Sequence, residues 1–354
     1  MSDTIHSPFK FLDAFQREDA GLYFGRDREV DELYELTFDT RLIVFFGASG
    51  TGKTSLVQCG LANKFPPARW QELYIRRNEN INTSLLGSIN DALAQAGGAP
   101  SEDPVDGLKA LHRHTYTPAY LLFDQFEELF ILQPDKAEQQ AFFAFLQRFM
   151  DTPMDARAIL VMREEFIAHL WDWEHLAPSL FDHRYRITHL EQEAIEGIVE
   201  NTLTQLDRQA RLRAEQPRAI AEQIWSKLAE SESGPSLTNL QIFLDRLYRQ
   251  AAESAEAQPR FTPALAAGMK NIDDLFDDFL EEELQKLEQQ LGPGREGVPI
   301  RLLAAFVSDE QTKKVLELES LQALQQKYQL TDAERELCLD VFENKLRILK
   351  SYEI

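Results

Sequence analysis

The sequence has little cysteine and no long apolar run. Cys59 and Cys338 are the only cysteines among its 354 residues, so we expect neither a disulfide framework nor a cysteine-based zinc site. The first residues lack the charged region and apolar run of a signal peptide, and no apolar stretch is long enough to span a bilayer. We therefore expect a cytoplasmic protein that has no membrane partner.

Positive charge is also scarce. The chain has 37 Lys and Arg against 59 Asp and Glu, which gives a formal net charge of −22 and a sequence pI near 4.8. Such a chain repels a polyanion unless a local basic patch overrides its net charge, so we expect no nucleic-acid partner. Part of the acidity lies in residues 273–288, where apolar residues recur at helical spacing. We interpret this segment as a helix with a solvated face, and a docking surface for a basic partner is the alternative.

What the sequence contains is an ordinary globular composition, with 44% hydrophobic and 27% charged residues. Apolar segments over 41–46, 72–77, 119–124 and 156–163 alternate with amphipathic helical patterns. Two of these segments are almost wholly apolar and end in a charge, as buried parallel strands do. We therefore predict an α/β fold with a doubly wound parallel sheet, whose ligand lies at the carboxyl ends of the strands.

The length predicts two or three domains. We expect a leader and a helix over 1–40, the α/β core over 41–187 and an all-helical domain over 188–258. The acidic helix then opens a third unit over 259–354. The small, polar and proline-bearing segment 252–263 is the linker we expect before this unit.

A glycine-rich loop between the first predicted strand and a helix matches G-x-x-x-x-G-K-[ST]. Its glycines let backbone N–H groups surround the phosphates of a nucleoside triphosphate, and the following helix adds its positive end. We expect Lys53 to bridge the β- and γ-phosphates and the Thr54 hydroxyl to bind Mg²⁺. The predicted nucleotide-binding residues are Gly47, Ala48, Ser49, Gly50, Thr51, Gly52, Lys53, Thr54 and Ser55.

An acid follows the third apolar strand, as a P-loop protein requires. Asp124 occupies the Walker B position, from which a carboxylate holds Mg²⁺, and no metal other than Mg²⁺ is indicated. Glu127 and Glu128 come three and four residues later, so that either could polarise the attacking water. The alternative for each glutamate is an acid favoured at a helix N-terminus.

Arg163 ends the next apolar strand and places a permanent cation on the same edge of the sheet. There it could sense or stabilise the γ-phosphate. An ion pair with Glu164 or Glu165 is the structural alternative. We predict the catalytic set to be Lys53, Asp124, Glu127, Glu128 and Arg163.

Four segments resemble one known family in the order that the family has them. They are SPFKFLDAFQREDAGLYFGRDREV at 7–30, YLLFDQFEELF at 120–130, ILVMREEF at 159–166 and LTNLQIFLDRLYRQ at 237–250. They are similar to the entry motif, the extended Walker B, the sensor-arginine strand and the following helix of the STAND signal-transduction ATPases, within these the novel STAND NTPases of bacteria. The matches extend over nearly the whole chain.

The resemblance implies that the nucleotide is ATP or ADP and that Phe24, Gly25 and Arg26 lie near the adenine, with core packing as the alternative for Phe24. It implies that residues 259–354 contain a winged-helix-like domain that closes over the nucleotide. Many relatives have a proline against the adenine where this chain has Thr238. The winged domain of the family continues beyond the position of Ile354, so we expect it to be truncated here, with effector and sensor domains or proteins outside the chain.

The function that follows is a regulatory, slow ATPase. We expect ATP loading to drive conformational change and homo-oligomerisation in signal transduction, by analogy in bacterial antiviral defence. Two alternatives remain open at this point. One is a nucleotide-binding scaffold without significant hydrolysis, and the other is a P-loop phosphotransferase, although the sequence contains no arginine-rich lid segment.

Overall fold

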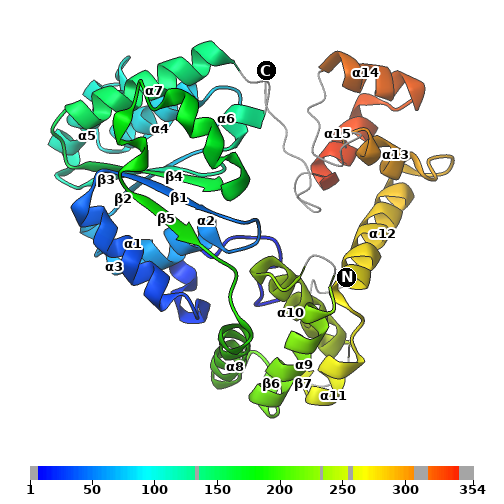
Figure 1. Ribbon diagram of the computed structural model, residues 1–354. Helices are drawn as coiled ribbons and strands as arrows, with labels where there is room; N and C mark the ends of the chain where they lie inside the picture. Colours follow the sequence, from blue (N-terminus) through cyan, green and yellow to red (C-terminus); the bar gives the residue numbers. More distant parts are fainter. Residues whose placement is uncertain (1–6, 132–134, 232–233, 254–257, 307–317, 343–354) are drawn as a thin grey trace. The chain divides into compact units, whose positions relative to one another are not determined.

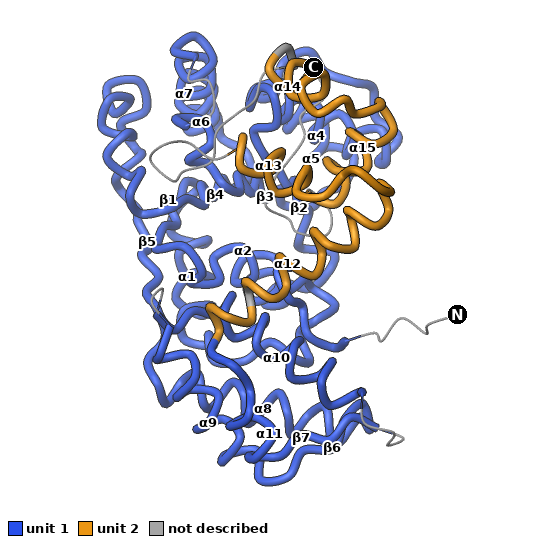
Figure 2. Tube along the Cα trace, turned by 90° about the vertical axis from the view of Figure 1, so that its right-hand side faces the viewer, with its two compact units in different colours: residues 1–271 blue, residues 272–354 orange. Residues whose placement is uncertain are grey.

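The structure is a computed structural model that describes residues 7–131, 135–231, 234–253, 258–306 and 318–342. It divides into two compact units, residues 1–271 and 272–354 (Figure 2). Unit 1 contains the α/β core and a helical part, and unit 2 contains helices in its described residues.

The core of unit 1 is a five-stranded parallel sheet (Figure 1). Its order is β2-β3-β4-β1-β5, which confirms the predicted fold class. The four predicted strands form, and a fifth strand, β5, was not expected because its residues RYRI are mostly polar and only Ile187 is buried. The strands are β1 (Leu42–Gly47), β2 (Gln71–Ile75), β3 (Ala119–Phe123), β4 (Ala156–Arg163) and β5 (Arg184–Ile187).

Helices cover both faces of this sheet. Alternate residues of β1 illustrate the two layers: Leu42 and Val44 pack under α4, α5 and α7, whereas Ile43 and Phe45 pack under α1 and the helix that follows the P-loop. This alternation follows from the two-residue period of a strand. The helices and 3₁₀ turns of this region are η1 (Arg17–Leu22), α1 (Asp27–Asp39), η3 (Pro67–Arg69), α4 (Ile81–Gln95), α5 (Pro104–Thr115), α6 (Glu128–Ile131), α7 (Lys136–Asp151), η4 (Glu164–Trp173) and η5 (Pro178–Phe181).

A helix was predicted directly after the glycine-rich loop. It forms as three consecutive segments, α2 (Lys53–Ser55), the π-helical η2 (Leu56–Leu61) and α3 (Ala62–Lys64). Gly60 lies in the π segment, where a Cβ would meet Val30 at 2.4 Å and Tyr23 at 3.1 Å. Close packing against α1 and the leader therefore requires glycine here, and π turns of this kind recur near functional sites.

The helical part of unit 1 contains α8 (Gln192–Arg208), α9 (Pro217–Ala229), α10 (Leu237–Ala252) and α11 (Pro263–Gly268). Two short strands, β6 (Arg213–Ala214) and β7 (Arg260–Phe261), pair in parallel. Phe261 is fully buried, and α11 packs on α9. Residues 260–268 therefore belong to the helical part, so the structure draws the boundary at 271 instead of the expected 258, and the expected linker is partly a strand.

Unit 2 has its own small apolar core. Its described helices are α12 (Ile272–Leu291), α13 (Val298–Ala304), α14 (Leu318–Lys327) and α15 (Asp332–Asp340). Leu287 of the acidic helix and Phe342 are buried in this core, and Arg295 pairs with Glu334 at 2.8 Å. One face of α12 thus packs, as the spacing predicted. Residues 307–317 and 343–354 lie outside the described residues, and with them part of the expected winged-helix-like domain.

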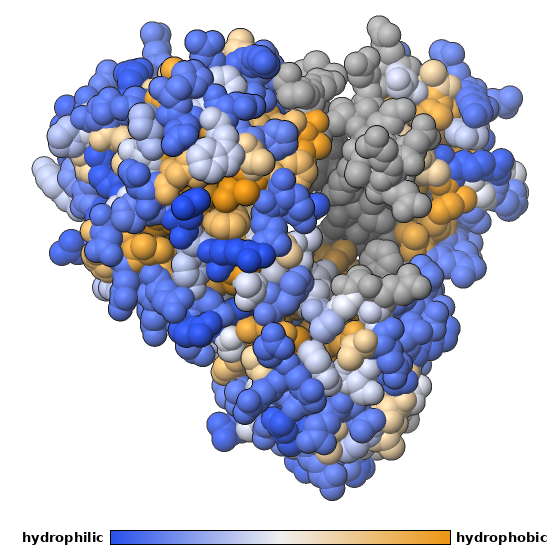
Figure 3. All heavy atoms as spheres, viewed as in Figure 1, coloured by the Kyte–Doolittle hydropathy of each residue, from blue (hydrophilic) through white to orange (hydrophobic). Residues whose placement is uncertain are grey.

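The surface of unit 1 is mainly polar. Figure 3 shows hydrophilic residues over most of its visible face, with apolar residues in small groups between them. Among the described residues, every helix is too short or too polar to cross a membrane.

Candidate functional site

The P-loop joins β1 to α2 at the carboxyl edge of the sheet. Gly50 and Gly52 have φ values of +74° and +85°, which L side chains rarely adopt. A Cβ on Gly52 would also come within 2.9 Å of Leu237. The Thr51 hydroxyl donates to the carbonyl of Ala48 at 2.9 Å and closes the loop on itself. The sequence thus produces the tight backbone turn that a phosphate cradle requires.

Lys53 lies over this loop. Its ammonium donates to the carbonyls of Gly47 and Ala48 at 2.9 and 2.8 Å. Burial lowers the pKa of Lys53 from its ordinary value, and Arg163 acts in the same direction, while Glu127 and Asp124 oppose them. A partly desolvated cation at this point suits an anionic ligand.

Thr54 and Asp124 meet as the motif predicts. The Thr54 hydroxyl donates to Oδ1 of Asp124 at 2.9 Å, and Asp124 is only 4% exposed. Two oxygen donors of this kind, one hydroxyl and one carboxylate, are the hard ligands that Mg²⁺ prefers. The residues present therefore fit the metal.

Two further residues, both missed by the sequence analysis, also bind Asp124. The Tyr74 hydroxyl donates to Oδ2 at 2.5 Å, and the Arg76 guanidinium donates to the same oxygen at 2.9 Å. Burial and then the Asp124 carboxylate raise the pKa of Tyr74, so its hydroxyl keeps its proton and acts as a donor. Arg76 directly follows β2, and the reasoning that selected Arg163 at the end of β4 could have found it.

Glu127 and Arg163 form an ion pair at the same edge. Nε of Arg163 lies 3.2 Å from Oε1 of Glu127, and the Arg163 backbone N–H donates to Oε2 at 3.2 Å. Burial raises the pKa of Glu127 above its ordinary value, while Arg163 and Lys53 act in the opposite direction. Glu127 is buried, whereas the Arg163 side chain is 46% exposed.

The structure distinguishes the two glutamates that the sequence left equivalent. Gln125 has a φ of +55°, so the chain turns sharply after Asp124 and α6 begins only at Glu128. Glu127 precedes the helix and contacts Arg163, while Glu128 is an acid in the first turn of α6. Glu164, one of the two partners expected under the structural alternative for Arg163, instead pairs with Arg186 at 2.8 Å.

Arg26 lies beneath the P-loop. It is 2% exposed, and its guanidinium donates to the carbonyls of Thr51 at 3.0 Å and Thr188 at 2.8 Å. The guanidinium also forms an ion pair with Glu29 at 2.7 Å. Arg26 therefore ties the leader to the loop and to the segment that follows β5.

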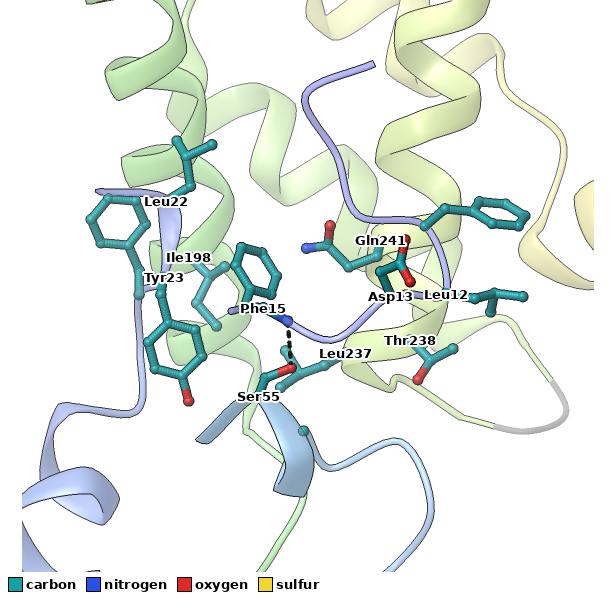
Figure 4. Close-up of a pocket in the computed structure, with 13 residues that line it drawn as sticks. Leu12, Asp13, Phe15, Leu22, Tyr23, Ser55, Ile198, Leu237, Thr238 and Gln241 are labelled. Carbon is teal, nitrogen blue, oxygen red and sulfur yellow. Dashed lines mark hydrogen bonds between the residues drawn. The ribbon is translucent and has the colours of Figure 1, made fainter. Parts of the chain in front are cut away.

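A pocket that is partly open to solvent lies beside the P-loop. Its walls come from the leader, from the loop and α2, and from α8 and α10 (Figure 4). Ser55 accepts a hydrogen bond from the Phe15 backbone N–H at 3.1 Å within it. The lining residues are Phe11, Leu12, Asp13, Phe15, Leu22, Tyr23, Phe24, Gly52, Ser55, Ile198, Leu237, Thr238 and Gln241.

Of the residues that the family resemblance had selected, Phe24 and Thr238 line this pocket, whereas Gly25 and Arg26 are not among its lining residues. Phe24 lines it, and Gly25 directly follows with a φ of +81° and a Cβ position only 2.5 Å from Ile198. Thr238, the residue found where relatives have a proline, lines the pocket from α10. The mainly apolar lining beside a phosphate loop suits the base and sugar of a nucleotide.

A P-loop between β1 and α2, an acid directly after β3 and an arginine at the end of β4 together define a P-loop NTPase. The chain belongs to the Novel STAND NTPase 1 family, whose sequence profile matches residues 8–350. This match confirms the resemblance drawn from the four motifs. No curated protein matches the sequence significantly.

Two solved structures illustrate the fold. The ORC2 protein of Aeropyrum pernix, solved as ADPNP-ADP complexes, is similar with a TM-score of 0.57 and 13% identity, over 91% of this chain and 95% of that chain. A Walker-type ATPase of Pyrococcus abyssi is similar with a TM-score of 0.50 and 15% identity, over 89% of this chain and 91% of that chain. Identities this low show the fold alone.

Proposed function

We propose that the protein is a regulatory switch that binds ATP at the P-loop, hydrolyses it slowly and couples the nucleotide state to conformational change and oligomerisation. The ion pair between Arg163 and Glu127, at 3.2 Å, is the observation that carries this proposal. Both groups act electrostatically on Lys53, so a terminal phosphate bound there would perturb all three charges at once. A diphosphate lacks this terminal phosphate and so would not perturb the three charges together.

In this proposal the residues from Gly47 to Ser55 hold the nucleotide, with Lys53 on its phosphates and Phe24, Gly25 and Arg26 on the side of the adenine. Thr54 and Asp124 would hold Mg²⁺, which when bound neutralises negative charge on the phosphates. The pocket beside Phe24 and Thr238 takes the nucleoside.

We assign to Glu127 the role of orienting the attacking water and accepting its proton. Its raised pKa supports this assignment, because a general base works best with a pKa near the operating pH. Arg163 would stabilise the charge that develops on the transferred phosphoryl group. Glu128 has the smaller role in this scheme, as an acid that favours the start of α6.

Nucleotide state must be transmitted to other elements if the protein is a switch. In unit 1 the Leu237 backbone N–H donates to the Gly50 carbonyl at 3.1 Å, which joins the helical part to the P-loop. We infer that a rearrangement of the loop on ATP binding moves α10 and exposes a surface for self-association. By analogy with signal-transduction ATPases, we place this switch in the cytoplasm, in bacterial antiviral defence, with sensor and effector domains or proteins as partners.

One experiment separates this function from its alternatives. Purified protein is incubated with ATP, Mg²⁺ and small phosphate acceptors, while phosphate release, phosphate transfer and particle mass are followed together. We expect slow release of phosphate and a mass increase with a non-hydrolysable ATP analogue. Lys53→Ala is the control, because it removes the cation and abolishes nucleotide binding.

The other outcomes have distinct meanings. Phosphate transfer to a small acceptor would contradict the switch and identify a phosphotransferase. Nucleotide binding with neither release nor a change of mass would identify a scaffold.

A further inference from the structure

The two oxygens of Asp124 have different partners. Oδ1 accepts only from the Thr54 hydroxyl among the hydrogen bonds of the described residues, on the side where a metal would lie. Oδ2 accepts from both the Tyr74 hydroxyl, at 2.5 Å, and the Arg76 guanidinium, at 2.9 Å. The carboxylate therefore has a metal-facing oxygen and a second oxygen that the protein itself neutralises.

The two donors to Oδ2 come from adjoining parts of the chain. Tyr74 lies on β2, the strand next to β3, and Arg76 directly follows β2. Both side chains reach Asp124, which directly follows β3. The Arg76 guanidinium also lies over the Tyr74 ring, 5.4 Å from its centroid. Its side chain is 30% exposed, against 4% for Asp124, so the ion pair is mostly removed from water and only weakly screened by salt.

Arg77, the residue after Arg76, pairs with a different carboxylate. It pairs with buried Glu138 at 2.6 Å, and the same carboxylate accepts a hydrogen bond from the backbone N–H of Ile81 at the start of α4. Arg76 instead directs its charge at the predicted metal ligand. An arginine held against a metal-binding carboxylate cancels much of the charge that would attract a divalent cation.

We propose that Arg76 is a positioning residue that acts as the built-in counter-ion of Asp124 and makes divalent-cation binding conditional on the nucleotide. Without phosphates, the cation meets a carboxylate whose charge is already balanced, and binds weakly. With phosphates at the P-loop, their oxygens supply the missing negative charge, and the metal enters together with the triphosphate. This inference rests on the proposed nucleotide and Mg²⁺ site, and it adds a reason for the metal and nucleotide to bind together.

The test uses Mn²⁺ alone on nucleotide-free protein, with free Mn²⁺ measured by electron paramagnetic resonance. Arg76→Gln keeps a hydrogen-bond donor for Oδ2 but removes the charge, and we expect it to bind Mn²⁺ roughly tenfold more tightly than the unmodified protein. Arg76→Lys keeps the charge and should bind as weakly as the unmodified protein. Tyr74→Phe removes the other donor to Oδ2 but leaves the cation, and should also leave Mn²⁺ affinity low.

Two controls fix the site and the folding. Adding Asp124→Asn to Arg76→Gln should remove the gained Mn²⁺ binding, because the metal then loses its carboxylate. Circular dichroism and the unfolding temperature establish that each variant is folded. If Arg76→Gln does not fold, Arg76→Lys still tests the proposal, since tight Mn²⁺ binding by this variant would overturn it.

Three outcomes would overturn the proposal: unchanged or weaker Mn²⁺ binding by Arg76→Gln, equal tightening by Tyr74→Phe, or gained binding that persists with Asp124→Asn. The assay contains no nucleotide, so it is independent of ATP hydrolysis. If Arg76→Gln gains Mn²⁺ affinity but the protein neither binds nor hydrolyses ATP, the role of Arg76 as counter-ion of Asp124 is supported and the proposed switch fails. If ATP is hydrolysed but Arg76→Gln does not change the Mn²⁺ affinity, the counter-ion role of Arg76 fails and the proposed switch is not affected.

Discussion

Leu237 donates its backbone N–H to the carbonyl of Gly50 at 3.1 Å, so the first residue of α10 is bonded directly to the P-loop. The N–H groups in the first turn of a helix have no partner within the helix. Here Ser236 caps one of them, on Asn239 at 3.1 Å, and the P-loop takes another. Within unit 1, the helical part is thus joined to the P-loop, whose glycines Gly50 and Gly52 both have positive φ.

Leu237→Pro tests whether this hydrogen bond couples the two parts. Proline is tolerated at the first position of a helix, and Ser236 before it already has an extended backbone, with φ −130° and ψ 158°. The variant therefore removes the N–H with little damage to α10. We expect the amides of the loop around Gly50 to exchange with solvent about fivefold faster, since a net hydrogen bond contributes about 1 kcal/mol.

Leu237→Ala is the matched control, because it keeps the N–H and loses the same side chain, which packs against Gly52. The comparison is made by hydrogen exchange and mass spectrometry on both variants. Equal exchange rates in the two would mean that the side chain and not the hydrogen bond holds the loop.

Much of the core was predictable from the sequence because burial there has a simple local signature. The segment 119–124 is apolar until its final acid, and this pattern alone placed Asp124 at the ligand edge of the sheet. The strand Arg184–Ile187 was missed because it lies at the sheet edge, where only one of its residues is buried. Its pairing with β1 is a tertiary effect that its residues do not encode locally.

A site residue could be predicted from the sequence where its position along its own strand determines where it lies in the site. Arg163 could be placed because it ends a strand. The position of its partner Glu127 depends on the left-handed backbone of Gln125, which no local sequence pattern predicts. Tyr74 and Arg76 were missed for a related reason, since their role depends on which strand neighbours β3. Strand order is decided by the packing of the whole sheet.

Glu127→Gln should separate binding from hydrolysis. The substitution keeps the size of the side chain and removes its ability to accept a proton, so we expect nucleotide affinity to be retained and turnover to fall by about 10²–10⁴-fold. Glu128→Gln is the control, because Glu128 lies in the first turn of α6, and its turnover should change little. Phosphate release under saturating ATP measures both. A larger loss from Glu128→Gln would transfer the role to that residue.

The pH dependence of hydrolysis should report the Glu127–Arg163 pair. A general base is inactive when protonated, so the rate falls as the pH drops through its pKa. Burial raises the pKa of Glu127, and Arg163 opposes this effect. Arg163→Gln should therefore move the acidic midpoint of the rate to higher pH, whatever it does to the maximal rate.

Arg186→Gln is the control for this shift. Arg186 is also an exposed arginine, one residue before the end of its strand, but it pairs with Glu164 at 2.8 Å. Its loss should leave the midpoint in place when turnover is measured across the acidic range. A midpoint that is the same in all three proteins would show that Glu127 does not limit the rate.

Gly25→Ala should destabilise unit 1 more than the backbone conformation alone explains. Gly25 has a φ of +81°, which costs about 1–2 kcal/mol for an L residue. The new Cβ would also come within 2.5 Å of the Ile198 side chain on α8, and overpacking adds about 1–3 kcal/mol. Gly97→Ala separates the two effects, because Gly97 has a φ of +74° and open space around its Cβ position.

We expect Gly97→Ala to lower the free energy of unfolding by only the backbone cost, as measured by denaturant titration. Adding Ile198→Ala to Gly25→Ala removes the methyl groups in the way, so the double variant should lose less free energy than the sum of the two single variants. If the two losses of free energy simply add, glycine is required at position 25 only because of its positive φ. A favourable coupling instead means that the leader and α8 must approach closely there, at the edge of the pocket that Phe24 and Ile198 line.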